Sequence, residues 1–181
     1  MRKFRRIGIS LVVAVLLLVG LVVPVGATNP TVTITVTAQV VSITNSQSTW
    51  AIGMVTLDDV KYFSADNLQN DTYSLITNTG SVTVDVEIQG SNFEGGSYDW
   101  TLAAAAGNQT YSLYANKAAT PTVYDVEVKT SGYVDITAAG GLAAEGTNAW
   151  SMNFTAPNEF SASDDGNAKN ATVTLVASKH V

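Results

Sequence analysis

The stretch SVTVDVEIQ, Ser81–Gln89, decides the fold class of this chain. Every second residue is apolar, and the residues between them are polar or charged. A period of two is the period of a β-strand, in which successive side chains point to opposite faces of the sheet. The stretch therefore predicts a half-buried strand whose inward residues are Val82, Val84, Val86 and Ile88, and whose outward residues are Thr83, Asp85, Glu87 and Gln89.

The residues just before this stretch predict a partner for it. Thr72–Thr77, TYSLIT, is a second run rich in residues that favour strands. Asn78-Thr79-Gly80-Ser81, which lies between the two runs, is typical of a turn. We therefore expect the two runs to pair as a β-hairpin.

Short runs of the same kind recur along the chain, whereas no amphipathic helix is indicated after residue 27. The runs are Thr31–Val40, Trp50–Met54, Tyr98–Ala103, Thr110–Ala115, Thr122–Lys129, Tyr133–Thr137, Asn148–Thr155 and Ala171–Ser178. Their spacing is uneven, Leu57–Asp71 is a long loop, and the Ala/Gly-rich Ala138–Gly146 is expected to be a loop too. Roughly 8–10 strands of this kind predict an all-β fold, an immunoglobulin-like β-sandwich.

The first of these runs continues into a change of phase. In TVTITVTAQVVSIT, Thr31–Thr44, the even-numbered positions are apolar up to Val40, after which Val41 and Ile43 are apolar. One extra residue turns every later side chain to the other face of a strand. The default expectation is a first strand that crosses between two sheets, and the alternatives are a strand end with a loop, or a strand donated to a neighbouring molecule.

Residues 1–27 have the composition of an export signal. Met1–Arg6 carries four basic residues, Ile7–Val23 is apolar, and Pro24 precedes the small-residue exit at Ala27. We expect a signal peptide over 1–27 that is cleaved after Ala27, and the alternative is an uncleaved N-terminal membrane anchor. The β-sandwich domain is then 28–181, which contacts a membrane only through an uncleaved leader.

The charge of that domain excludes one class of partner. Four of the nine Lys and Arg residues lie in the leader and all fifteen acidic residues lie after it, so five basic residues face fifteen acidic ones, a net charge of −10. Nucleic-acid binding needs a basic surface and is not expected. The chain has no cysteine, so no disulfide framework supports the exported domain.

Catalysis has little support in the sequence. The only histidine, His180, is the residue before the last, whereas a catalytic triad needs a histidine held inside the fold. Zinc sites usually use cysteine and histidine ligands, and this chain has no cysteine and a single histidine next to its last residue. We predict no enzymatic activity and no cofactor, with calcium as the open metal and an extracellular enzyme as the remaining alternative.

Two kinds of site remain as candidates: a calcium site and a glycosylation site. Calcium takes oxygen ligands, for which the candidates are Asp164, Asp165 and Asn167, with a second oxygen-rich pair at Asp58-Asp59. Asp-Gly-Asn is also an ordinary turn sequence, and we favour the turn. Glycosylation needs an exposed Asn-x-Ser/Thr sequon, and the candidates are Asn70, Asn108, Asn153 and Asn170.

Aromatic residues could form a carbohydrate platform or a core. Each tryptophan is in phase with an apolar neighbour, which predicts core packing for Trp50, Trp100 and Trp150. The candidates for an exposed aromatic patch are Tyr98, Tyr114 and Tyr133.

Two tryptophan motifs carry a resemblance to a known family. Trp100-Thr101-Leu102 and Trp150-Ser151-Met152, followed by Ala171–Leu175, ATVTL, resemble the paired W-x-L pattern of WxL-type surface domains, although Met152 stands where the pattern has leucine. The stretch SLITNTGSVTVDVEIQGSNF also resembles a strand–turn–strand unit of prokaryotic immunoglobulin-like surface proteins. The resemblance implies a secreted β-sandwich at a bacterial cell wall.

These observations together predict an exported cell-surface protein with a structural or adhesive role, such as a subunit of a fibre or surface layer. Its expected partners are further copies of itself or cell-wall glycan. The alternative is a non-catalytic carbohydrate- or cell-wall-binding module.

Overall fold

The computed structural model describes residues 34–63, 73–117, 123–161 and 166–181, and these are all-β, with no helix among them. The expected signal helix lies outside the described residues. The chain divides into two compact units, Met1–Thr37 and Ala38–Val181. All the strands of the described residues lie in the second unit.

The second unit contains three β-sheets. Its strands are β1 (Ile43–Asn45), β2 (Val60–Tyr62), β3 (Ser74–Asn78), β4 (Val84–Gly90), β5 (Thr101–Leu102), β6 (Thr110–Asn116), β7 (Tyr124–Glu127), β8 (Val134–Asp135), β9 (Thr147–Trp150), β10 (Met152–Thr155) and β11 (Val173–Lys179). Sheet A has the order β1-β3-β9, sheet B has the order β2-β10-β6-β5 with β7 also on β6, and sheet C has the order β11-β4-β8. All pairs are antiparallel except β5 with β6.

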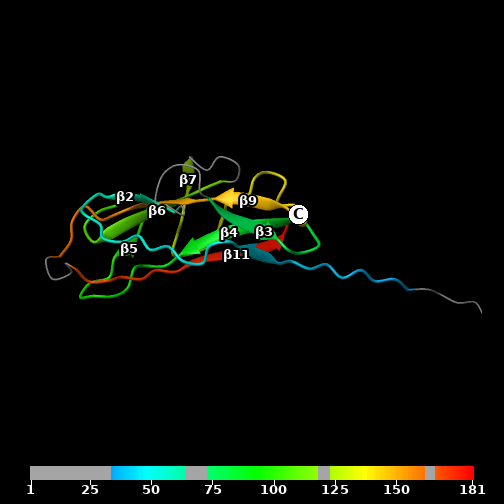
Figure 1. The fold of residues 1–181 in the computed structure, drawn as a ribbon, viewed down its shortest axis with the longest axis horizontal. Helices are drawn as coiled ribbons and strands as arrows, with labels where there is room; N and C mark the ends of the chain where they lie inside the picture. Colours follow the sequence, from blue (N-terminus) through cyan, green and yellow to red (C-terminus); the bar gives the residue numbers. More distant parts are fainter. Residues whose placement is uncertain (1–33, 64–72, 118–122, 162–165) are drawn as a thin grey trace, which may run out of the picture. The chain divides into compact units, whose positions relative to one another are not determined.

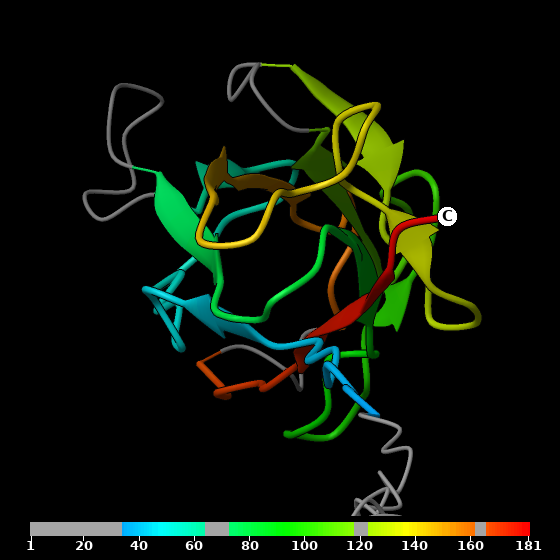
Figure 2. The same cartoon turned by 90° about the vertical axis from the view of Figure 1, so that its right-hand side faces the viewer.

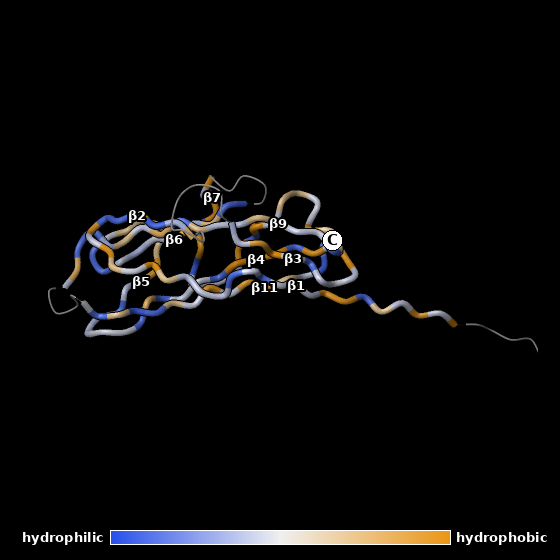
Figure 3. The backbone as a smooth tube through the Cα atoms, viewed as in Figure 1, coloured by the Kyte–Doolittle hydropathy of each residue, from blue (hydrophilic) through white to orange (hydrophobic). Residues whose placement is uncertain are grey.

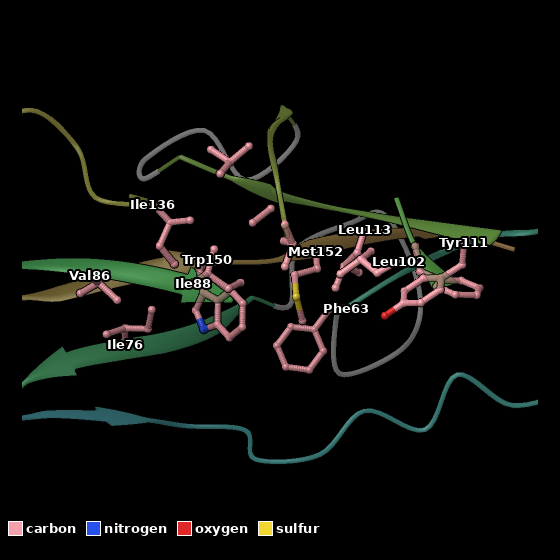
Figure 4. Close-up of a cluster of buried hydrophobic side chains, with 14 of the residues drawn as sticks. Phe63, Ile76, Val86, Ile88, Leu102, Tyr111, Leu113, Ile136, Trp150 and Met152 are labelled. Atoms are coloured by element: carbon pink, nitrogen blue, oxygen red, sulfur yellow. The ribbon is translucent and has the colours of Figure 1, made fainter. Parts of the chain in front are cut away.

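Within this unit the strands of sheet B lie at one end, and those of sheets A and C lie together at the other (Figure 1). Viewed end-on, the strands surround a shared interior (Figure 2). That interior is one apolar core, to which β3, β4 and β9 contribute Ile76, Ile88 and Trp150, all at most 2% exposed (Figure 4). Burial of such side chains stabilises a fold by about 1.5–3 kcal/mol each. Since the chain has no cysteine, this apolar core stabilises the unit without disulfides.

The stretch that decides the fold class forms β4, as predicted. Val84, Val86 and Ile88 are 0%, 2% and 0% exposed, while the residues between them are half-buried. The predicted runs at 110–115, 122–129, 133–137 and 171–178 also contain strands, namely β6, β7, β8 and β11. The Ala138–Gly146 segment has no helix, as expected; it is joined to β4 by the bridge between Leu142 and Val84 and to β3 by hydrogen bonds with Asn78.

The predicted hairpin between 72–77 and 81–89 is wrong. β3 pairs with β1 and β9 in sheet A, whereas β4 pairs with β11 and β8 in sheet C. The turn residues therefore carry the chain from one sheet to another rather than back along the same sheet. A turn sequence limits the direction of the chain only locally, so it does not specify which sheet the next strand joins.

Asn78 stabilises this crossover. Its side chain is fully buried, and its Nδ2 donates to the carbonyl oxygens of Val82 (2.8 Å) and Leu142 (2.9 Å). Its Oδ1 accepts a hydrogen bond from the N–H of Gly80 (2.9 Å). A buried amide whose hydrogen bonds are satisfied holds the backbone in one conformation, because leaving either group unpaired costs about 1–3 kcal/mol.

The predicted single strand Asn148–Thr155 is two strands. Residues up to Trp150 pair with β3 in sheet A, and residues from Met152 pair with β6 and β2 in sheet B. Buried Ser151 lies at the change of sheet, where its N–H donates to Asn116 Oδ1 (2.5 Å) and its Oγ donates to the carbonyl oxygen of Phe63 (2.7 Å). The alternation continues through Ser151, so the sequence pattern alone does not reveal the change.

Three other predictions about strands need correction. Residues 34–40, the described part of the expected first strand Thr31–Val40, form no strand, and the sheet-crossing first strand is therefore not found there. Trp50–Met54 forms no strand either, and Met54 is 94% exposed. In the expected loop Leu57–Asp71, Val60–Tyr62 is strand β2, which is too short for a period-two pattern to reveal.

We expect Gly80→Ala to lower the free energy of unfolding by about 1–3 kcal/mol, the usual cost of overpacking. A Cβ at Gly80 would lie 2.3 Å from the carbonyl oxygen of Val40 and 3.0 Å from the nitrogen of Ser42. Urea denaturation measures the effect. Gly107→Ala is the matched control, since the nearest atom to its Cβ would be 3.7 Å away. Equal losses in the two variants would contradict a close approach at Gly80.

Candidate functional site

The segment before β1 is apolar on one face and lacks strand pairing. Ile34 and Val36 are 83% and 84% exposed, and the intervening Thr35 and Thr37 are exposed too. Figure 3 shows the alternating hydropathy along the segment. Within the described ranges, residues 34–39 belong to no strand and make no backbone hydrogen bond. The segment therefore has the sequence pattern of a β-strand but is not paired with any described strand.

The chain becomes fixed at Val40, where the second unit's hydrogen bonding begins. The carbonyl oxygen of Val40 accepts from the N–H of Ser81 (2.9 Å), and the N–H of Val40 donates to Ser81 Oγ (2.9 Å). The carbonyl oxygen of Ser42 accepts from the N–H groups of Thr79 (2.9 Å) and Gly80 (3.2 Å). After the change of phase, Ile43 is half-buried and packs against the core. The change of phase therefore marks the place where the chain joins its own fold.

A second feature of the same kind is the outer edge of β11. Along β11 all seven residues are opposite residues of β4, and in the described residues no strand pairs with its other side. The N–H of His180 donates to the carbonyl oxygen of Thr83 on the β4 side (3.0 Å). Because alternate residues of a strand turn their backbone groups to the same neighbour, Thr174, Val176 and Ser178 also face β4. Consequently Val173, Leu175, Ala177 and Lys179 direct their backbone groups to the free edge.

The apolar face of β11 is incompletely covered. Leu175 and Ala177 are half-buried, although their partners Ile88 and Val86 on β4 are 0% and 2% exposed. The core is therefore closed over β4 and partly open beside β11.

His180 lies at the end of this edge strand, held by Asp85. Its Nδ1 is 2.7 Å from Asp85 Oδ1, and the two side chains are 36% and 29% exposed. Gly141 leaves room for the ring, because a Cβ there would lie 2.9 Å from His180 Cγ. Sequence reasoning treated His180 as a terminal residue without a fixed position, and the contact with Asp85 corrects that. The pair anchors the end of β11 to β4.

Metal ligands do not gather in the described residues, where no group of three or more His, Asp or Glu side chains could hold an ion. Of the calcium candidates, Asp164 and Asp165 lie outside the described residues, and Asn167 is exposed. Asp58-Asp59 lies in a turn: the N–H of Thr56 donates to Asp59 Oδ2 (2.8 Å), and this bond lowers the pKa of Asp59.

The sequons lie in different settings. Asn70 is outside the described residues, while Asn108 and Asn170 are exposed. Asn108 Nδ2 donates to Glu159 Oε2 (2.9 Å), and Asn170 forms a bridge with Glu94. Asn153 is half-buried on β10, between Tyr62 and Tyr114 on the neighbouring strands.

The tryptophans pack with other aromatic rings. Trp150 is 2% exposed, and its Nε1 donates to Asn45 Oδ1 (3.0 Å). Trp50 is half-buried, with its ring centroid 5.5 Å from that of Phe63. Trp100 is half-buried and stacks on Phe160, with centroids 5.0 Å apart. All three rings are thus engaged with the apolar interior or its margin.

The tyrosine candidates come from separate elements. Tyr98 precedes β5, Tyr114 is on β6, and Tyr133 precedes β8. Tyr98 and Tyr133 are 47% and 44% exposed, while Tyr114 is half-buried and its hydroxyl donates to the carbonyl oxygen of Ala104 (2.7 Å). No ring contact joins any two of these three described residues.

Asp135 on β8 of sheet C forms an ion pair with Lys117. Lys117 Nζ is 3.0 Å from Asp135 Oδ2, and the N–H of Thr137 donates to Asp135 Oδ1 (2.8 Å). Burial alone would raise the pKa of Asp135, but these hydrogen bonds and the charge of Lys117 outweigh it and lower the pKa from its ordinary value of 3.8.

The described residues contain no helix with the length and hydropathy needed to cross a membrane. No described protein family, curated protein or solved structure matches the chain.

We expect Asp135→Asn to lower the free energy of unfolding at about pH 7 by less than about 1 kcal/mol, since the pair is partly exposed. A carboxylate whose pKa is lowered by folding stabilises the protein above its unfolded pKa, and this contribution disappears as the pH falls through the folded pKa. The variant and the parent should therefore converge in acid, below the ordinary value of 3.8.

Urea denaturation at about pH 7 and about pH 2.5 measures the difference, with the window taken from the lowered carboxylate pKa. Asp125→Asn is the control, because Asp125 is exposed on β7 and has no ion pair among the described residues. A loss in Asp135→Asn that persists unchanged in acid would contradict an electrostatic origin.

Proposed function

We propose that this protein is an exported structural subunit of the cell surface that assembles with further copies of itself by donating its N-terminal strand. The observation that carries the proposal is the state of residues 34–39: they alternate like a strand, expose Ile34 and Val36 almost fully, and make no backbone hydrogen bond in the described structure. Addition to a sheet of another molecule would pair the backbone of this segment and bury its apolar side chains. Main-chain pairing supplies affinity in such contacts, and alternate side chains fill pockets of the acceptor.

The energetic objection to donation is weak for this segment. A donated strand normally gives up its pairing within its own chain, but residues 34–39 have no such pairing to give up in the described ranges. Burial of Ile34 and Val36 in a neighbour would gain about 1.5–3 kcal/mol for each side chain. Donation therefore adds contacts without removing any that the described structure contains.

The geometry of such a contact favours a filament. The donor lies at the start of the domain and the acceptor on another part of its surface, so the contact is head-to-tail, and a head-to-tail contact that does not close into a ring builds an open filament. The basic and apolar leader, Met1–Ala27, supports export, and retention by an uncleaved leader remains part of the proposal. A net charge of −10 after the leader suits a soluble surface that resists non-specific association.

The finer description of the fold belongs to this proposal as well. An immunoglobulin-like sandwich is supported by sheets of mostly antiparallel strands that pack around one apolar core. We favour assembly over carbohydrate or cell-wall binding, because the tryptophan rings of the W-x-L-like motifs are packed and the three tyrosines lie on separate elements. Enzymatic activity and a cofactor are not part of the proposal.

We expect a chain that begins at Thr28 to form fibres at high concentration, and a chain that begins at Val41 to stay monomeric and folded. The shorter chain loses the donor and the two bonds of Val40 to Ser81, but it keeps the two hydrogen bonds that the carbonyl oxygen of Ser42 accepts from the N–H groups of Thr79 and Gly80. Size exclusion and electron microscopy distinguish the two. A Thr28 chain that stays a monomer would remove the main support for assembly, and a Val41 chain that unfolds would place residues 28–40 in their own core.

We expect the pair Ile34→Asp and Val36→Asp to abolish assembly without changing the stability of the monomer, because both side chains are already exposed to water. The matched control is Thr35→Asp with Thr37→Asp, which adds the same charge to the polar face of the segment. Sedimentation of the assembled fraction and thermal unfolding of the monomer measure the two effects. Loss of assembly in both pairs would indicate general charge repulsion instead of a buried apolar face.

A further inference from the structure

We propose that the acceptor of the donated strand is the free outer edge of β11 in a neighbouring copy of the chain. This inference rests on the proposed function and adds the site of contact to it. Residues 34–39 of one molecule would extend sheet C of the next as a strand beside β11.

The two segments match in pattern. The donor reads Ile-Thr-Val-Thr-Ala-Gln over 34–39, and β11 reads Val-Thr-Leu-Val-Ala-Ser-Lys over 173–179. In both, the alternate positions that begin with the first residue are apolar, apart from the final Lys179. Paired side by side, Ile34 and Val36 would cover the half-buried Leu175 and Ala177, and the donor threonines would lie on the outward face with Thr174 and Ser178. Cross-strand pairs of this kind stabilise a sheet.

The lengths are similar too. The six residues 34–39 span about 20 Å when extended, at roughly 3.3 Å per residue, and β11 has seven residues. The backbone groups of Val173, Leu175 and Ala177 face the free edge, because His180 and the residues in phase with it face β4. One donor strand of this length can therefore pair along most of the edge.

β11 lacks the features that usually protect an edge. Exposed edge strands are commonly short, charged or interrupted by proline. β11 is seven residues long, has no proline, and carries its only charge at Lys179. Other edges in the described sheets are shorter: β1 and β2 have three residues each, and β2 contains Lys61, which pairs with Asp59 at 3.7 Å. β1 lies next to β11 in Figures 1 and 2, yet no backbone hydrogen bond joins them.

The sequence before Val40 disfavours a hairpin that would pair the donor with a strand of its own domain. Val40 is fixed to Ser81, so a hairpin would have to reverse at Ala38-Gln39. Tight reversals between strands use Gly, Asn or Asp at residues with positive φ, and TAQV has none of them. The lack of turn residues at this point favours a second molecule as the acceptor.

Disulfide mapping tests this acceptor directly, because the chain has no cysteine of its own. The full chain is expressed with its leader in an exporting host, and the exported protein is collected whether released or membrane-held. Val36→Cys in one preparation is mixed with Val173→Cys, Leu175→Cys or Ala177→Cys in another, so that any mixed bond is intermolecular. The control partner is Val60→Cys, which is 44% exposed on the edge strand β2.

We expect at least one β11 variant to give about tenfold more mixed dimer than the Val60→Cys control, since a disulfide needs Cβ atoms about 3.5–4.5 Å apart. If the parent chain assembles but Val36→Cys links to Val60→Cys as well as, or better than, to β11, the acceptor is not β11 and the proposed function stands. If the parent chain does not assemble, the proposed function fails, and the acceptor with it. Circular dichroism of each variant checks that the fold is retained.

Discussion

The hydrogen bonds between Val40 or Ser42 and the Thr79–Ser81 turn are the interaction on which the rest of this structure depends. They fix the first residues of the domain against the segment that carries the chain from sheet A to sheet C. Asn78 holds that same segment from inside, through bonds to Val82 and Leu142. The chain is part of the fold after this point, and before it the described residues have no backbone partner. One local cluster of hydrogen bonds thus separates a folded domain from an unpaired strand.

Two parts of the described structure lack a strand partner. The segment before Val40 leaves its apolar face exposed and its backbone unpaired, and β11 has an unpaired edge beside half-buried apolar side chains. Burial of apolar area and pairing between strands are the main sources of stability in a β-protein. Under the proposal, the segment before Val40 and the edge of β11 would each supply the strand partner and the apolar contact that the other lacks. Without disulfides, the domain depends on its apolar core for stability, so pairing between copies would add stability as well as build an assembly.

Much of the fold could be predicted from period-two alternation, because burial on one face leaves its mark along each strand. Val84, Val86 and Ile88 are the clearest case, and β7 follows the same rule, whereas β6 is buried on both faces. The pairing of strands could not be predicted, since Asn78 depends on Leu142, which is sixty-four positions away in sequence. Nor could the break at Ser151, where the alternation continues unchanged. For the candidate site, the sequence indicates the donor through its change of phase at Val40-Val41. The open edge of β11 depends on sheet order, and no local pattern of residues encodes that order.

Hydrogen exchange of the assembled protein, compared with the dilute monomer, tests strand donation most directly. Amide protection reports whether a backbone N–H is hydrogen-bonded within a stable structure. Strand donation predicts that the amides of residues 34–39 exchange rapidly in the monomer and become protected on assembly, while the core strand β4 is protected in both states. Protection of residues 34–39 in the monomer, or rapid exchange of the segment in the assembly, would contradict it.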